Sequence, residues 1–535
     1  PIPLLPPAAG TAPAAGADIT AKPLAPLDPS WIGTLATSDG AFPGTMWQGT
    51  PRATVAAALP QLAPSESPAL RDLARRLLFS DAVAPEGADP AGGPSLATLR
   101  LERMLALGFV SAALPLADHL PAAAQTSDAF ERSRVELLFA ANDTAGACTA
   151  IKAAIVRYDE PWWDRALIAC QALNGQKREA DFGLSLLAER KAPRDPLFDA
   201  LIETLDGHRR KLDRLPQPTP VTLALWAATK TPLPATAVAA AGPAALHGYA
   251  TNSAVPAALR LAAAERALRL GALPPDALAK LYADVSATPR EEKAALAPGV
   301  LPATARQRAV LYDIAASAAT PAKTRLAALA ALLAEARKER ALPAVAPLLA
   351  PLIAALPATG TSPGTAADAA SALLAAGDAE AAGPWLAAAD DDGLRLIAHI
   401  AAPESEPVDV AALLRSALAG LGPRDAAARQ AKAGLLLTLV AAFAPPDAAP
   451  LPALPPGPDH AAALPSATLW LALQDAAAGK RLGETVLTAL IVATDDGRLS
   501  IEPIILGRIL GALGAVGLAP AARRIAVEAA IDAGI

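Results

Sequence analysis

Cys148 and Cys170 are the only two cysteines of the chain, and their spacing bears directly on covalent chemistry. A bend between two helices is predicted at Glu160 and Pro161, because proline opens helices more readily than it continues them. The cysteines lie 12 residues before and 10 residues after Glu160, so they stand at similar heights in an antiparallel helix pair. A disulfide needs Cα atoms about 4.4–6.8 Å apart, which alanine-lined helices allow. We predict a disulfide between them, with two buried free thiols as the alternative.

A disulfide would also indicate where the protein works. Disulfides persist in oxidising compartments and are rare in the cytosol. The chain starts at Pro1 with a Pro/Ala-rich stretch of the kind that often follows a cleaved secretory signal. We therefore expect a periplasmic or otherwise extracytoplasmic location, with a cytoplasmic location as the alternative.

Four tryptophans are candidates for partner binding. Trp162 and Trp163 are adjacent at the start of a predicted helix. Side chains of adjacent helical residues point in different directions, so one ring can enter the core while the other faces the next repeat or a partner. Trp31 and Trp47 belong to a Pro/Ala-rich stretch and are expected to anchor it on this chain or on a partner. Core packing is the alternative for all four.

Residues for catalysis or metal binding form no recognisable pattern. The histidines are far apart and lack the spacing of a zinc-binding helix; they are His119, His208, His247, His399 and His460. Asp390–Asp392 and Asp495–Asp496 lack the alternating ligands of a calcium loop and are expected at helix starts or turns. The sequence therefore predicts no catalytic residue, no metal site and no cofactor.

Glycines recur at spacings of four and three near the end of the chain, at Gly507, Gly511, Gly514 and Gly517. They do not form the GxxxxGK[ST] or GxGxxG patterns that cradle phosphate groups. The spacing instead predicts one smooth helix face for close packing, either on another helix or on a second protomer.

Helices joined by regular turns must position these residues. Asn142, Asn174 and Asp206 each begin a turn that closes a helical run, and they are 32 residues apart. Gly108 lies 34 residues before Asn142 and continues the series. This period is typical of a helix–turn–helix repeat.

The composition favours an all-α chain. Of its 535 residues, 53% are hydrophobic but only 4% are aromatic, so alanine carries the apolar content and allows close helix packing. A proline inside a helix costs about 3 kcal/mol, so the 53 prolines are expected mainly at helix starts and in connections. We predict many short helices and very little strand.

Two segments with small residues after a turn, Asp143–Ala147 and Gly377–Ala381, resemble degenerate tetratricopeptide (TPR-like) or related α-solenoid repeats. The resemblance covers residues 100–207 and, more weakly, 255–535. It implies an α-solenoid of antiparallel helix hairpins with a long concave surface for other proteins.

Four regions follow from the pattern of helices and prolines. Residues 1–45 are an extended Pro/Ala-rich arm or linker, and 46–215 are an N-terminal helical repeat array. Residues 216–254 are an irregular Pro-rich junction, or alternatively a repeat with shortened helices, and 255–535 are a C-terminal array. Further turns are predicted near Gly271, Gly377, Pro445, Gly479 and Gly517.

Charge and hydropathy argue against nucleic-acid binding and against a transmembrane segment. The net charge is −6 and the basic residues are scattered, whereas nucleic-acid binding needs a basic face or stripe. Prolines interrupt the apolar stretch at 341–358, and Arg508 interrupts the one at 504–522, where a spanning helix needs about 20 apolar residues.

The function expected from these features is a non-catalytic interaction scaffold. We expect a structural or assembly component of a bacterial cell-envelope complex, which binds other proteins of that assembly or associates with itself. One alternative is a periplasmic enzyme with a helical superstructure that cleaves glycan, similar to a transglycosylase. A second alternative is a carrier that holds a lipid or small ligand inside a curled solenoid.

Overall fold

The computed structural model describes residues 28–208, 217–297, 299–403, 408–421, 426–443, 465–500 and 502–535. Within these ranges the chain forms 27 α-helices and one two-stranded antiparallel hairpin, so the predicted all-α class is confirmed. Over the same ranges, no helix combines the length and the apolar character needed to cross a membrane.

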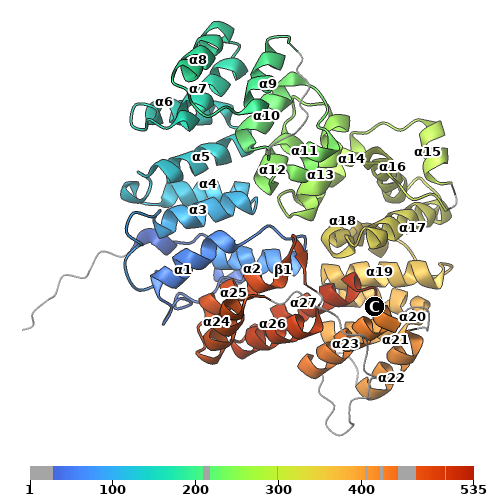
Figure 1. Cartoon of the computed structure of the whole chain (residues 1–535). Coiled ribbons are helices and arrows are strands. Elements are labelled where there is room, and N and C mark those ends of the chain that lie inside the picture. The colour runs from blue at the N-terminus through green and yellow to red at the C-terminus, as the bar shows by residue number, and fades with distance from the viewer. Residues whose placement is uncertain are drawn as a thin grey trace, which may run out of the picture.

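The first nine α-helices form a stack that leads away from the N-terminal residues (Figure 1). Short 3-10 helices accompany them at Pro29–Trp31, Thr37–Asp39, Leu59–Gln61 and Ala122–Ala124. The α-helices are α1 Arg52–Ala58, α2 Pro68–Phe79, α3 Leu96–Ala106, α4 Val110–His119, α5 Asp128–Ala140, α6 Thr144–Ala154, α7 Pro161–Leu173, α8 Lys177–Glu189 and α9 Pro196–Leu205.

The middle of the chain continues the stack and bends it back. Its helices are α10 Pro220–Thr229, α11 Ala235–Ala240, α12 Pro243–Thr251, α13 Ala257–Arg269, α14 Pro275–Ala283, α15 Pro289–Ala295, α16 Ala305–Ala316, α17 Ala322–Lys338, α18 Leu342–Ala354 and α19 Pro363–Ala376. Many of them begin with proline in the first turn, where its missing N–H and fixed φ cost the helix nothing.

The last helices return to the beginning of the chain. They are α20 Ala379–Ala389, α21 Asp392–Ala401, α22 Val410–Gly420, α23 Ala426–Phe443, α24 Ala467–Ala478, α25 Leu482–Ala493, α26 Pro503–Ala515 and α27 Ala519–Asp532. The strands β1 Thr494–Asp495 and β2 Arg498–Leu499 form the hairpin between α25 and α26.

The predicted turns of the N-terminal series are confirmed by the backbone. Gly108, Asn142, Gly175 and Gly207 have φ values of 79°, 61°, 74° and 97°. A residue in this left-handed conformation ends a helix and lets the next one fold back. Gly271, Gly377 and Gly517 play the same part later in the chain, while the turn predicted at Pro445 lies outside the described residues.

The boundaries predicted for the arm and the junction need correction. Residues 28–45 are folded against α2: the Gly33 amide donates to the Asp81 carboxylate over 3.0 Å, and Leu35 bridges to Ser80. The rest of the predicted arm lies outside the described residues. Residues 217–254 form the short helices α10, α11 and α12, which pack on α5 and α13. The alternative of a repeat with shortened helices therefore describes them better than an irregular junction, because their prolines open helices.

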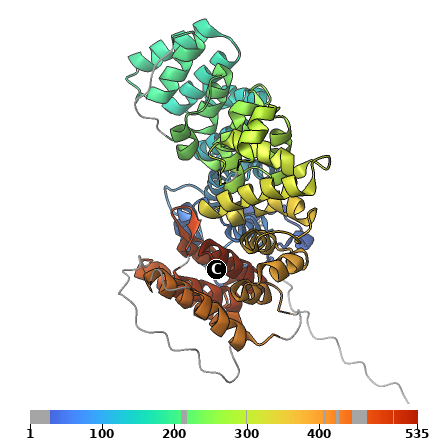
Figure 2. The same cartoon turned by 90° about the vertical axis from the view of Figure 1, so that its right-hand side faces the viewer.

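The two ends of the solenoid meet. Figures 1 and 2 show the last helices beside α1 and α2, and α2 contacts both α25 and α27. Helix α27 also contacts α18, α19, α21, α23 and α26, and every residue from Ile525 to Ile531 is buried. A helix that is buried on nearly all sides belongs to the centre of a core, so the stack closes around its own last helix.

Candidate functional site

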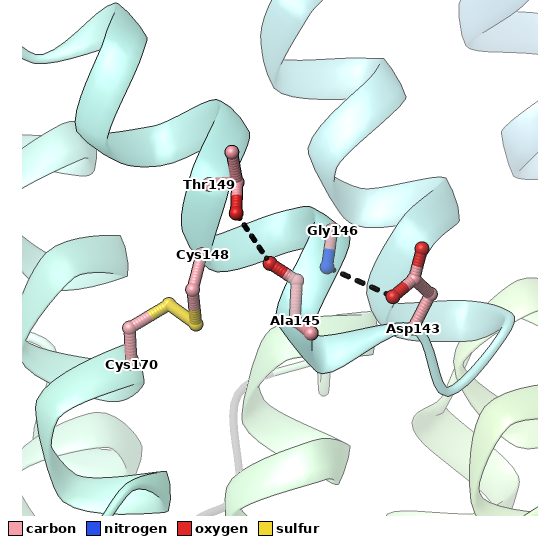
Figure 3. Close-up of a disulfide and its surroundings, with 6 residues drawn as sticks. All are labelled: Asp143, Ala145, Gly146, Cys148, Thr149 and Cys170. Carbon is pink, nitrogen blue, oxygen red and sulfur yellow. Dashed lines mark hydrogen bonds between the residues drawn. A yellow bond between two sulfur atoms is a disulfide. The ribbon is translucent and has the colours of Figure 1, made fainter.

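The predicted disulfide joins α6 to α7 (Figure 3). The Cα atoms of Cys148 and Cys170 are 5.6 Å apart, and both side chains are buried. Helix α6 is held in place by its cap, since the Asp143 carboxylate accepts a hydrogen bond of 2.8 Å from the Gly146 amide. The disulfide is a covalent clamp between neighbouring helices.

Three of the four candidate tryptophans are in the core. Trp31, Trp47 and Trp163 have 2% or less of their surface exposed, so a partner cannot reach them and their expected role is replaced by packing within this chain. The Trp31 and Trp47 rings meet edge to face with centroids 4.6 Å apart. Trp162 is only partly buried, and Arg132 lies 5.1 Å from its ring centre.

The acidic runs are at the turns where the sequence predicts them. The Asp391 carboxylate accepts from the Leu394 amide and caps α21, and Asp496 and Gly497 form the turn between β1 and β2. His247 is bonded through its ring to the backbone oxygen of Ala272. Among the described residues, no group of three or more histidine, cysteine, aspartate or glutamate side chains is placed to hold a metal ion.

Three buried carboxylates have unusual electrostatics. Burial raises the pKa of Glu136 and of Glu528 to about 7 in each case, and that of Asp532 to about 6. Glu136 accepts from the Val221 amide at the start of α10, and Glu528 accepts from the Ala69 amide at the start of α2. Both cap helix N-termini, where a carboxylate satisfies free N–H groups, so their role is structural.

A recess among the C-terminal helices runs along both sides of α26. We call it the α26 groove. One side lies between α26 and α24 with a volume of about 470 Å³, and the other lies between α26 and α23 with a volume of about 760 Å³. Gly507, Arg508 and Gly511 line both sides, so the two recesses form one surface.

The floor of the α26 groove is smooth because it is built from glycine. A Cβ added at Gly511 or Gly514 would meet no atom within 4 Å, whereas one at Gly507 would lie 3.0 Å from the Thr438 side chain. The predicted smooth face is therefore partly used by α23 and partly open. Gly517 is not on this face, because it forms the turn after α26.

Apolar side chains form the rim of the groove. Ile504 is 61% exposed, and Trp470 and Phe443 are partly buried in the lining. No periodicity in the sequence marks these three residues, since most of the residues in their helices are apolar. They were missed because their role depends on which helices stand next to α26.

The charged residues that line the α26 groove are all basic: Lys480, Arg508 and Arg523. The Lys480 ammonium donates to the Ala515 oxygen at the end of α26, and the Arg523 guanidinium lies 5.6 Å from the Phe443 ring centre. Arg508 is exposed, and no described side chain pairs with it. The groove therefore combines an apolar floor with a positive potential.

Comparison of the chain with known protein families, curated proteins and solved structures found no significant match. Function therefore has to be inferred from the geometry and chemistry of the chain itself.

Proposed function

We propose that the protein is a non-catalytic scaffold with a TPR-like solenoid, and that it binds an acidic amphipathic helix of a partner protein in the α26 groove. Helix-in-groove recognition places the apolar face of one helix in an apolar groove of another protein. Glycine on the floor lets two helix backbones approach closely.

The charge of the groove is the observation that carries this proposal. Lys480, Arg508 and Arg523 are the charged residues of its lining, although the chain as a whole has a net charge of −6. Carboxylates that flank the apolar face of a partner helix would meet these cations. Complementary charge of this kind selects partners and orients them.

The disulfide supports a site of action outside the cytosol. A bridge such as Cys148–Cys170 forms and persists in oxidising compartments. We infer that the scaffold belongs to an assembly in the periplasm or elsewhere in the cell envelope of a bacterium, where the acidic helix would be supplied by another component.

A pair of designed peptides tests the groove. Both carry the same leucine and alanine face, one flanked by glutamate and the other by lysine, and their binding is followed by fluorescence anisotropy. The acidic peptide should bind the full chain at least about tenfold more tightly than the basic one at low salt. Equal binding of the two peptides, or binding of neither, would overturn the proposal.

Matched variants place the binding on the groove. Gly511→Leu fills the open floor. Gly383→Leu adds the same side chain to an exposed glycine of α20, where an added Cβ would likewise meet no atom within 4 Å. Only G511L should weaken the binding of the acidic peptide, by about tenfold or more in affinity. Arg508→Glu should reverse the preference between the peptides. Unchanged binding in G511L would move the site elsewhere.

A further inference from the structure

A second recess lies within the middle helices, far along the chain from the α26 groove. It is a cavity of about 500 Å³ bounded by α13, α14, α16, α17 and α18. This volume is typical of small-molecule sites. One wall is apolar and is built from Leu278, Leu332, Val345, Leu348 and Leu349. Such a wall would take the hydrocarbon body of a small ligand.

The lining of the cavity also carries a network of charged groups. The Arg308 guanidinium donates to both oxygens of Glu265 over 2.9 and 2.6 Å and to one oxygen of Glu335 over 3.0 Å. The Tyr282 hydroxyl also donates to Glu265 over 2.7 Å. Glu265 is thus fully engaged, while Glu335 shares the same arginine.

Glu335 is the group with free capacity. Its Oε1 accepts from Arg308, and its Oε2 accepts from no described residue. Burial raises the pKa of Glu335, and the nearby charge of Arg308 lowers it in part. The Tyr312 hydroxyl lines the same cavity without a described hydrogen bond.

The other basic residues of the lining are already paired or lie at the rim. Arg266 and Arg269 both donate to Glu66. Lys338 is exposed, as is the oppositely charged Glu339 beside it. The Tyr282 and Tyr312 rings lie tilted at 54° to one another with centroids 5.3 Å apart, and the faces of aromatic rings attract cations. The Glu335 oxygen that accepts from no described residue and the two tyrosine rings therefore favour a positively charged donor group.

We propose that this cavity binds a small aliphatic amine, with its ammonium group on Glu335 and Tyr312 and its hydrocarbon body against the leucine wall. An ammonium group supplies the donor that Glu335 Oε2 lacks among the described residues. A carboxylate ligand would add a third negative group to the network. A neutral alcohol would retain the apolar contacts but lose the ion pair. This site is independent of the α26 groove.

Three ligands with one hydrocarbon body test the proposal: hexylammonium, hexanol and hexanoate, titrated into the full chain by isothermal calorimetry. Hexylammonium should bind about tenfold more tightly than hexanol, and hexanoate should bind most weakly. Equal or tighter binding of hexanoate, or binding of none of the three, would overturn the assignment.

Variants on one helix locate the ammonium group. Glu335→Gln should lower the affinity for hexylammonium about tenfold and leave the affinity for hexanol unchanged. Glu339→Gln, at the rim of the same cavity, should change either ligand by less than about twofold. If E335Q does not fold, Tyr312→Phe is the variant to measure, and it should lower the affinity for hexylammonium a few-fold. Unaltered amine affinity in the variant measured would refute the placement.

Discussion

Glu528 is a single carboxylate on which the two ends of the chain depend. It lies on α27 with 2% of its surface exposed, and it accepts from the Ala69 amide over 2.8 Å and from the Ser67 hydroxyl. Burial raises its pKa to about 7, so the folded protein retains the proton at a pH where the unfolded chain has lost it. This coupling makes stability depend on pH.

Glu528→Gln should remove that dependence. A raised folded-state pKa gives stability that is fully present below the unfolded value of 4.5 and is lost as the pH rises through about 7. The free energy of unfolding of E528Q, relative to the unsubstituted protein, should therefore increase by about 3 kcal/mol between pH 4.5 and pH 7. Urea denaturation at several pH values measures it.

The control for this prediction is Glu380→Gln, on an exposed part of α20. It should leave the pH profile unchanged within about 0.5 kcal/mol. Glu136 and Asp532 remain in both proteins, so their contributions cancel in the difference. A difference between E528Q and the unsubstituted protein that does not vary with pH would show that Glu528 stays ionised when folded.

At the scale of elements, residues 28–45 behave as part of the first helical layer. They lie so close to the end of α2 that a Cβ on Gly33 would overlap the backbone of Ser80 and Asp81. The Arg100 guanidinium lies 4.7 Å from the Trp31 ring centre and donates to the Ile32 oxygen over 2.7 Å. Close backbone contact and a buried cation hold this segment in place.

Gly33→Ala should loosen the segment. The added methyl group cannot be accommodated without a backbone shift, so the free energy of unfolding should fall by about 1–3 kcal/mol, and the tryptophan emission should shift to the red. Gly44→Ala is the matched control, because its Cβ would lie 3.9 Å from the nearest atom. Comparable losses in both variants would mean that the close contact at Gly33 does not matter.

At the scale of the whole molecule, closure of the stack is the dominant feature. Glu66 precedes α2 and receives ion pairs from Arg266 and Arg269 of α13, while α27 packs on α2 from the other end of the chain. An open solenoid would stabilise each repeat only through its neighbours. Here contacts between distant repeats tie the first, middle and last helices together.

A chain that ends at residue 518 tests this closure. Without α27 the apolar faces of α2, α18, α19 and α21 lose their common neighbour, so we expect loss of a cooperative thermal transition and strong binding of a hydrophobic dye. A chain that starts at residue 28 keeps the contacts described for α27 and should unfold cooperatively. If the chain lacking α27 unfolds at an unchanged midpoint temperature, α27 does not contribute to the stability of the closed stack.

Local patterns predicted much of the architecture. The turns at Gly108, Asn142 and Gly175 are set by residues that tolerate positive φ, and the Cys148–Cys170 pairing follows from similar distances to one bend. The boundaries at 45 and 216–254 were less well predicted. Proline-rich composition marks helix starts as readily as linkers, and one pattern cannot separate the two.

The candidate sites were predicted only in part. The glycine spacing indicated a smooth face on α26, and Gly511 and Gly514 are indeed open on it. Nothing in the sequence marked Glu335 or Tyr312, which lie on two different helices and meet only across the cavity. The burial of Trp31 and Trp47 likewise depends on neighbours that the local pattern does not specify.

The sequence alone determined the helices, their turns and the disulfide, because each depends on interactions over a few turns of chain. Only the tertiary structure decided which faces meet. Ser67 and Glu528 are 461 residues apart and yet in hydrogen-bond contact. Alanine-rich helix faces are small and alike, and apolar burial is not directional, so such faces do not identify their partners in advance. The closed stack, the α26 groove and the cavity bounded by α13, α14, α16, α17 and α18 all arise from packing between helices that the local sequence does not specify.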